Sequence, residues 1–162
     1  MTIWVDADAC PVVIREILYR AARRTGISLT LVANHDIPVP RAANIRMIRV
    51  GAGFDAADDL ILEQIGTGDL LVSADITLVA EAMARGVQAL HPRGETFSPD
   101  TIRARLNMRD FMETMRSSGL HGGGPPPLGP RERQAFAAQL DRVLAHRGQQ
   151  RTPPAPSGRS RG

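Results

Sequence analysis

The chain of 162 residues contains no lysine, a single cysteine, and no apolar stretch that approaches the roughly 20 residues of a membrane-spanning helix. We therefore expect no membrane association. The lone Cys10 excludes an intramolecular disulfide and is typical of a protein in the reducing cytoplasm. Because the first residues lead directly into an apolar strand, we also expect no signal peptide.

The charge of the chain is unevenly distributed. All 20 basic residues are arginines, the formal net charge is +3 and the pI is about 10.3. Residues 148–162 hold three arginines and no acid, which leaves 17 arginines (20 less three) against 17 Asp and Glu residues. A basic tail can help to hold a polyanion, but the neutral remainder gives no general electrostatic argument for nucleic-acid binding. We expect a single domain at residues 1–147 and a disordered basic tail at 148–162.

Short apolar runs alternate with segments of helical periodicity. The first expected strand ends at Asp6, and the others cover residues 28–33, 46–50, 70–73 and 87–90. The first three expected helices run from the residues after Asp6 to Gly26, from Asp55 to about Gly66 and from Asp75 to Gly86. Two further helices are expected to begin at Ser98 and at Pro130. This alternation predicts a three-layer α/β fold with a mainly parallel sheet of about five strands, helices on both faces and C-terminal helices. Residues 117–130 are dominated by Gly and Pro and are expected to form a loop.

The first strand carries the most informative feature, because its apolar residues are followed by Asp6 and Asp8. Open α/β sheets bind their ligands at the carboxyl ends of such strands. Carboxylates at that position are costly to desolvate without a partner. The usual partner is a divalent cation, a basic ligand or a proton on one acid of the pair. The segment therefore predicts a site.

Two more acids are expected to join this pair. Asp75 also follows an apolar strand, so it should lie at the same edge of the sheet as Asp6. Asp58 shares a helix face with Ile61 and should point inward. Hard oxygen ligands favour Mg²⁺ or Mn²⁺, which activate water and bind phosphoryl oxygens. We predict that Asp6, Asp58 and Asp75 bind the metal, with Asp8 as a further ligand or a general base.

A structural role competes with this interpretation. Asp55 and Asp75 are suitable helix N-caps, and Asp58 in the first turn suits the helix dipole. Asp69 precedes its strand, so it is expected at the opposite end of the sheet as a turn residue. No capping role accounts for Asp6, which makes it the strongest site candidate.

Other residues near the same edge are secondary candidates. Asn34 and Ser73 are predicted to contact a substrate. His35 and His91, which follow strands, could orient a ligand or water. Cys10 at a helix start could be an activated nucleophile, although lone cysteines more often behave as small buried hydrophobes. The three glycines at 122–124 lack the strand and lysine of a phosphate-binding loop.

The chain resembles the YaiI/YqxD family of uncharacterised bacterial proteins from residue 2 to about 146. The resemblance rests on the segments Val5–Pro11, Val32–Asn34, Asp55–Asp58, Gly68–Asp75, Arg93–Gly94, Gly123–Pro125 and Arg133–Phe136. This family is usually grouped with PIN-like domains, whose recognised members are metal-dependent nucleases that act largely on RNA. The resemblance implies a three-layer PIN-like (Rossmann-like) fold and matches Asp6, Asp58 and the Ser73–Asp75 segment to PIN acids. One PIN acid has no counterpart, since residues 34–54 contain only Asp36.

Three functional hypotheses follow. The first is a metal-dependent ribonuclease or related phosphodiesterase, with RNA or another phosphate-containing ligand as partner. The second is a haloacid-dehalogenase-like phosphatase with Asp6 as nucleophile and Asp8 as acid/base, although the lysine of that class is absent. The third is a PIN-like protein that binds metal or nucleic acid without catalysis.

Overall fold

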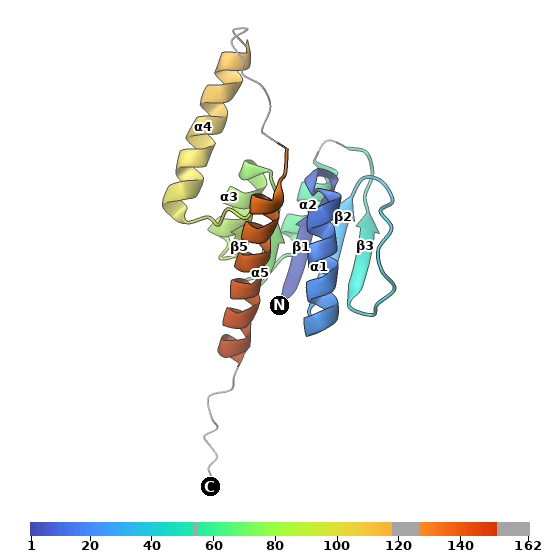
Figure 1. The fold of residues 1–162 in the computed structure, drawn as a ribbon. Helices are drawn as coiled ribbons and strands as arrows, with labels where there is room; N and C mark the ends of the chain where they lie inside the picture. Colours follow the sequence, from blue (N-terminus) through green and yellow to red (C-terminus); the bar gives the residue numbers. More distant parts are fainter. Residues whose placement is uncertain (54, 118–126, 152–162) are drawn as a thin grey trace.

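The computed structural model describes residues 1–53, 55–117 and 127–151 (Figure 1). Strands and helices alternate through the first 90 residues, and two longer helices follow. In chain order the elements are β1 (Thr2–Asp6), the 3₁₀ turn η1 (Ala7–Ala9), α1 (Val12–Thr25), β2 (Ser28–Ala33), β3 (Ile45–Arg49), α2 (Ala56–Gln64), β4 (Leu70–Val72), α3 (Ile76–Ala84), β5 (Gln88–Leu90), α4 (Pro99–Ser117) and α5 (Pro130–Arg151).

Within the described residues, the strands form one five-stranded sheet in the order β3-β2-β1-β4-β5, and every neighbouring pair is parallel. This confirms the predicted α/β fold with its parallel sheet. The chain moves outward from the central β1 to β2 and β3, and then crosses to β4 and β5 on the other side of β1. The order of the strands therefore reverses between β1 and β4, and ligands of open α/β sheets bind at the carboxyl ends of the strands at such a switch point.

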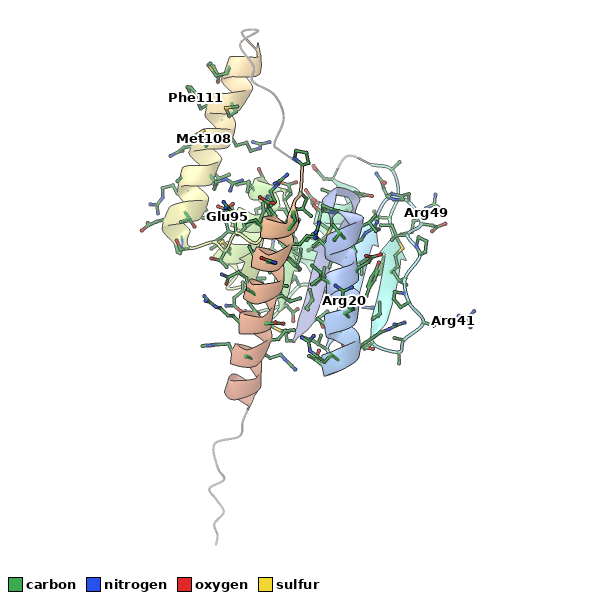
Figure 2. All side chains as sticks on the ribbon, viewed as in Figure 1. Arg20, Arg41, Arg49, Glu95, Met108 and Phe111 are labelled. Atoms are coloured by element: carbon green, nitrogen blue, oxygen red, sulfur yellow. The ribbon has the colours of Figure 1, made fainter. Side chains whose placement is uncertain are left out.

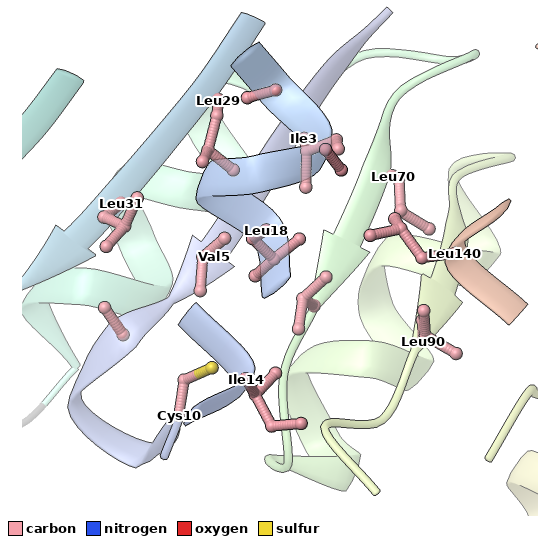
Figure 3. Close-up of a cluster of buried hydrophobic side chains, with 14 of the residues drawn as sticks. Ile3, Val5, Cys10, Ile14, Leu18, Leu29, Leu31, Leu70, Leu90 and Leu140 are labelled. Atoms are coloured by element: carbon pink, nitrogen blue, oxygen red, sulfur yellow. The ribbon is translucent and has the colours of Figure 1, made fainter. Parts of the chain in front are cut away.

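One face of the sheet packs against α1 and α5. Ile3 and Val5 of β1 point to this face, where they meet Ile14 and Leu18 of α1 in a core that also contains Leu140 of α5 (Figure 3). Gly26, with a φ of 76°, ends α1 in the left-handed conformation that glycine adopts without strain.

The opposite face packs against α2, α3 and the start of α4. Trp4 of β1 lies in this second core with Ile61 of α2, Leu78 of α3 and Ile102 of α4. Since side chains alternate along a strand, Asp6 has the same parity as Trp4 and lies on this face. The β1 carboxylate is therefore placed on the side of the sheet from which α2 and α3 bring their own acids.

The observed elements differ in detail from the sequence prediction. β3 begins one residue earlier than expected, at Ile45, and α2 ends at Gln64. α5 continues to Arg151, so residues 148–151 of the predicted tail are helical, and residues 152–162 lie outside the described residues. Of the predicted 117–130 loop, residues 118–126 are also outside them, while 127–129 are non-helical. None of the helices in the described part of the chain is long and apolar enough to cross a membrane.

The outer half of α4 carries exposed apolar side chains. Met108 and Phe111 are 55% and 57% exposed, and both lie on the part of the helix that extends away from the sheet (Figure 2). Ile102, near the start of the helix, is buried and Leu106 is half-buried against α3. Among the described side chains of α4, those of the first turns therefore contribute to the core.

Candidate functional site

Asp6 and Ser73 form the centre of the candidate site at the switch point of the sheet. Asp6 ends β1 and Ser73 directly follows β4, and β1 and β4 are neighbours. The Ser73 hydroxyl donates a hydrogen bond of 3.0 Å to Oδ2 of Asp6. It also accepts the backbone N–H of Asp75 at 2.9 Å. Ser73 is fully buried, which favours a role in positioning Asp6 and Asp75 over the predicted contact with a substrate.

Burial is the main perturbation of Asp6, whose side chain is among the buried polar groups. It raises the pKa of Asp6, the Ser73 hydrogen bond opposes this rise, and the charges of Asp75 and Asp8 add to it. A buried carboxylate that is repelled by two further carboxylates is stabilised by any cation or proton that reaches it.

Asp75 is the N-cap of α3, as the sequence predicts. Its Oδ1 accepts the backbone N–H of Leu78 at 3.2 Å, which satisfies one of the free donors of the first helical turn. Capping occupies one of the two carboxylate oxygens, so the same side chain can also offer Oδ2 to a ligand. The structural role and the predicted metal role are therefore compatible.

Asp58 approaches this pair from the first turn of α2. Its pKa is raised to about 7, first by burial, then by the charges of Asp75, Asp6 and Asp55, and finally by a hydrogen bond between the Asp58 and Asp75 carboxyl groups. Asp58 is half-buried whereas its neighbour Asp59 is exposed, as the predicted inward and outward faces of the helix require. The structure thus brings Asp6, Asp58 and Asp75 into one electrostatic unit, the acidic cluster.

The acidic cluster is not a preformed metal cage. Within the described residues, no three or more His, Cys, Asp or Glu side chains stand close enough together to hold a metal ion. The donor set is chemically suitable, because carboxylate oxygens are the ligands that Mg²⁺ and Mn²⁺ prefer. The raised pKa values of Asp6 and Asp58 also indicate a surplus of negative charge. Binding a cation would require the side chains to converge further.

Asp8 is directed toward the end of β2. It lies in η1, where its Oδ2 accepts the backbone N–H of Asn34 at 3.0 Å and its Oδ1 lies 2.9 Å from Nδ1 of His35. These contacts fix the loop after β2 against η1. They engage both Asp8 oxygens, which favours a positioning role over the acid/base role in the phosphatase hypothesis. Contact of the exposed Asn34 side chain with a substrate stays a prediction.

Of the two other acids for which a structural role was predicted, Asp69 has one and Asp55 does not form the expected hydrogen bond. Asp69 lies at the opposite end of the sheet, as predicted, and its carboxylate accepts the backbone N–H groups of Thr2 and Gly66 and the indole N–H of Trp4. Asp55 occupies the N-cap position of α2, but its side chain accepts no hydrogen bond from the first turn, so the predicted cap is only positional.

Cys10 does not have the properties of a nucleophile. It is 6% exposed in the core between β1 and α1, and burial raises the pKa of its thiol to about 12 (Figure 3). The thiol is therefore protonated at neutral pH, which supports the interpretation as a small buried hydrophobe.

Two residues that the sequence reasoning did not select line a cavity near the carboxyl ends of the strands. Arg105 of α4 pairs with Glu95 from the loop after β5, and both line a cavity that also reaches Ala74. No local sequence pattern predicts an ion pair between a loop acid and an arginine ten residues later, because that contact depends on the path of the loop between β5 and α4. A motif search that begins from strand ends therefore misses them.

Comparison with known proteins assigns the chain to a group of homologues. The family model described as "Uncharacterized BCR, YaiI/YqxD family" matches residues 4–146. A UPF0178 protein of Aliivibrio fischeri (strain MJ11) is 63% identical over 145 residues, which cover 90% of this chain and 97% of the relative. UPF0178 proteins of Thioalkalivibrio sulfidiphilus and Halorhodospira halophila are each 59% identical, over 91% and 93% of this chain and 100% and 99% of their own lengths. No solved structure shows a significant match.

Proposed function

The chain belongs to the uncharacterised YaiI/YqxD family, and from its acidic cluster we propose that it is a Mg²⁺- or Mn²⁺-dependent phosphodiesterase that acts on single-stranded RNA. The observation that carries this proposal is the raised pKa of Asp6 and of Asp58, which burial causes first and the negative charge of neighbouring carboxylates, Asp75 among them, increases. Strongly perturbed acids at the switch point of a parallel sheet are typical of a functional site.

The three acids have separable roles in this proposal. Asp6, held by the Ser73 hydroxyl on the central strand, is the fixed ligand. Asp58 and Asp75 complete the site from α2 and from the cap of α3. A bound divalent cation would supply charge neutralisation at the phosphoryl oxygens and a water of lowered pKa. In the hydrolysis, the water oxygen forms a bond to phosphorus, the bond from phosphorus to the leaving oxygen breaks, and that oxygen takes up a proton.

The direct test combines metal binding and cleavage. Mn²⁺ titrated into the metal-free protein should raise its melting temperature, and more at pH 8 than at pH 5.5, because the cation competes with the proton on Asp58. With Mn²⁺ present, the protein should cleave a fluorescent single-stranded RNA, and EDTA should stop the cleavage. Asp6→Asn should reduce the rate at least about a hundredfold, since it removes one anionic ligand. Asp59→Asn, on the exposed face of α2, is the matched control.

A second candidate is a protein that binds a metal without catalysis. The observation that favours it over the phosphodiesterase is the PIN acid without a counterpart, since residues 34–54 contain only Asp36. Binding of Mn²⁺ that depends on Asp6, without cleavage of RNA, DNA or an aryl phosphodiester, would support this candidate and exclude the phosphodiesterase. No Mn²⁺ binding and no cleavage would exclude both.

A further inference from the structure

A cavity of about 670 Å³ lies near the carboxyl ends of β1, β4 and β5, although none of the three acids of the acidic cluster lines it. Two of its lining residues connect it to that cluster, because Ala74 stands between Ser73 and Asp75 and Ala9 follows Asp8. The cavity falls within the usual size range of small-molecule sites, roughly 300–1,000 Å³. A ligand that fills it would therefore lie next to the backbone segments that carry Asp8 and Asp75.

Part of the lining of the cavity is basic. Arg93 and Arg105 line it, and Glu95 is the one acid among the lining residues. Glu95 forms an ion pair with Arg105, which orients that guanidinium (Figure 2 labels Glu95 beside the lower end of α4), and the two arginines outnumber the one acid among the lining residues. Guanidinium groups recognise phosphate through paired N–H donors. The cavity thus attracts an anionic group at a distance from the acids that would repel it.

His91 adds a neutral hydrogen-bond donor. The backbone N–H of Arg93 donates to Nδ1 of His91 at 3.0 Å, so in the neutral ring the proton resides on Nε2. Burial, and then the nearby charge of Arg105, lower the pKa of His91, which keeps the ring uncharged at neutral pH. His91 lines the cavity and can offer Nε2–H to an oxygen of a ligand.

The rest of the lining is apolar. Pro11 at the start of α1, Pro92 after β5 and Leu128 before α5 come from three different parts of the chain and line the same cavity as the two arginines. Apolar walls with a few convergent polar groups are typical of sites that take a flat ring together with a charged group. A nucleotide has this combination, whereas an inorganic anion would use only the basic wall.

We propose that this cavity binds one nucleotide of the single-stranded substrate, next to the phosphodiester that faces the acidic cluster. Arg93 and Arg105 contact its phosphate, His91 donates to an oxygen, and Pro11 and Leu128 pack against its base or sugar. The assignment rests on the proposed function, because it treats the bound nucleotide as part of the same substrate. It also predicts selectivity for single strands, since a base in a duplex cannot enter a cavity without leaving its stack.

The test measures binding separately from cleavage. Adenosine 5′-monophosphate, adenosine and inorganic phosphate are titrated separately, by calorimetry, into the 162-residue protein in EDTA. We expect the monophosphate to bind at least about tenfold more tightly than adenosine or inorganic phosphate, because only the monophosphate contacts both the basic and the apolar lining residues. Arg105→Gln should weaken binding about tenfold or more and Arg105→Lys should restore part of it. The control is Arg41→Gln, an exposed arginine on the opposite flank of the molecule (Figure 2).

A second variant does not disturb the Arg105–Glu95 pair. Leu128→Glu places a negative charge at the cavity wall, and we expect it to weaken monophosphate binding more than adenosine binding. Equal binding of the monophosphate to the wild type, Arg105→Gln and Leu128→Glu would overturn the proposal, as would equal affinity for inorganic phosphate. If these variants weaken binding while the wild type cleaves no RNA with Mn²⁺, the cavity assignment stands and the phosphodiesterase proposal fails.

Discussion

The hydroxyl of Ser73 links two acids of the cluster, because it donates to Asp6 and at the same time accepts the backbone N–H of Asp75. A single buried oxygen thereby sets both the orientation of the β1 carboxylate and the start of α3. This link joins the two central strands at the point where the strand order reverses. Any function of the cluster should therefore depend on Ser73 even without contact between Ser73 and a substrate.

We expect Ser73→Ala to lower the free energy of unfolding by about 1–3 kcal/mol, because it leaves the Asp75 N–H and the Asp6 carboxylate without a partner in a buried position. The pKa of Asp6 should rise further, since the Ser73 hydrogen bond lowers it. Urea unfolding and carboxyl NMR titration measure the two effects. Ser28→Ala, at an exposed serine at the start of β2, is the control, and equal stability of both variants would contradict the prediction.

Asp58 should make the metal-free protein less stable as the pH rises. Its pKa in the folded protein is about 7, against the ordinary aspartate value of 3.8, so between these pH values the native state holds a proton that the unfolded state has lost. Unfolding free energy therefore falls as the pH rises through that interval, and the full penalty is present above about pH 7. Asp58→Asn removes the charge and should stabilise the protein at pH 8.

The measurement is urea unfolding in EDTA at pH 4 and pH 8. The unfolding free energy of Asp58→Asn should exceed that of the wild type at pH 8. The two values should be closer at pH 4, where the Asp58 carboxyl of the wild type is already neutral in the folded protein. Asp59→Asn, on the exposed side of the same turn, should show no such difference between the two pH values. An Asp58→Asn effect that is the same at both pH values would show that Asp58 titrates normally.

The sequence could predict which acids meet but not how they are held. The placement of Asp6 and Asp75 at one edge follows from the parallel sheet, and the inward face of Asp58 follows from helical periodicity. The contacts of Ser73 and Asp8 could not be predicted in this way, because each joins residues 26 to 67 positions apart in sequence. Such contacts depend on strand order and on the path of loops, which local patterns do not specify.

The same limit applies to the cavity and to α4. Apolar spacing predicted a helix through Phe111 and Met112, but not that these side chains would be exposed, because exposure depends on where the neighbouring α3 ends. Nothing in the sequence distinguishes Arg105 and Glu95 from ordinary surface residues. The path of the loop between β5 and α4 brings both to the cavity that Ala74 also lines. The acidic half of the candidate site was therefore predictable, whereas the basic half was not.

Gly94 marks the closest approach of the cavity loop to α5, and we expect Gly94→Ala to be strongly destabilising. Its φ is 94°, and a Cβ atom at this position would lie 2.6 Å from Cβ of Ala135 and 2.7 Å from the backbone N of Phe136. Left-handed strain costs about 1–2 kcal/mol, and displacing the helix backbone should add about 1–3 kcal/mol. Gly26→Ala has the same strain, with φ of 76°, but no atom within 4 Å.

The difference between these two glycine variants in urea unfolding isolates the steric term. Gly94→Ala should lose more stability than Gly26→Ala by the cost of moving the loop away from α5. The same movement should weaken nucleotide binding, since Arg93 and Glu95 flank Gly94 and both line the cavity. Equal losses in the two variants would mean that the loop and α5 separate without cost.

Cys10 should be unreactive in the folded protein. Its thiol is buried with a pKa of about 12, whereas an unfolded cysteine has a pKa of roughly 8.5, so the thiolate fraction at pH 8 is about a thousandfold smaller in the native state. Iodoacetamide should therefore label the native protein at least about a thousandfold more slowly than the protein in guanidinium chloride, as followed by mass spectrometry. The single cysteine makes the readout unambiguous. Rapid labelling of the native protein would instead restore Cys10 as a candidate nucleophile beside Asp6.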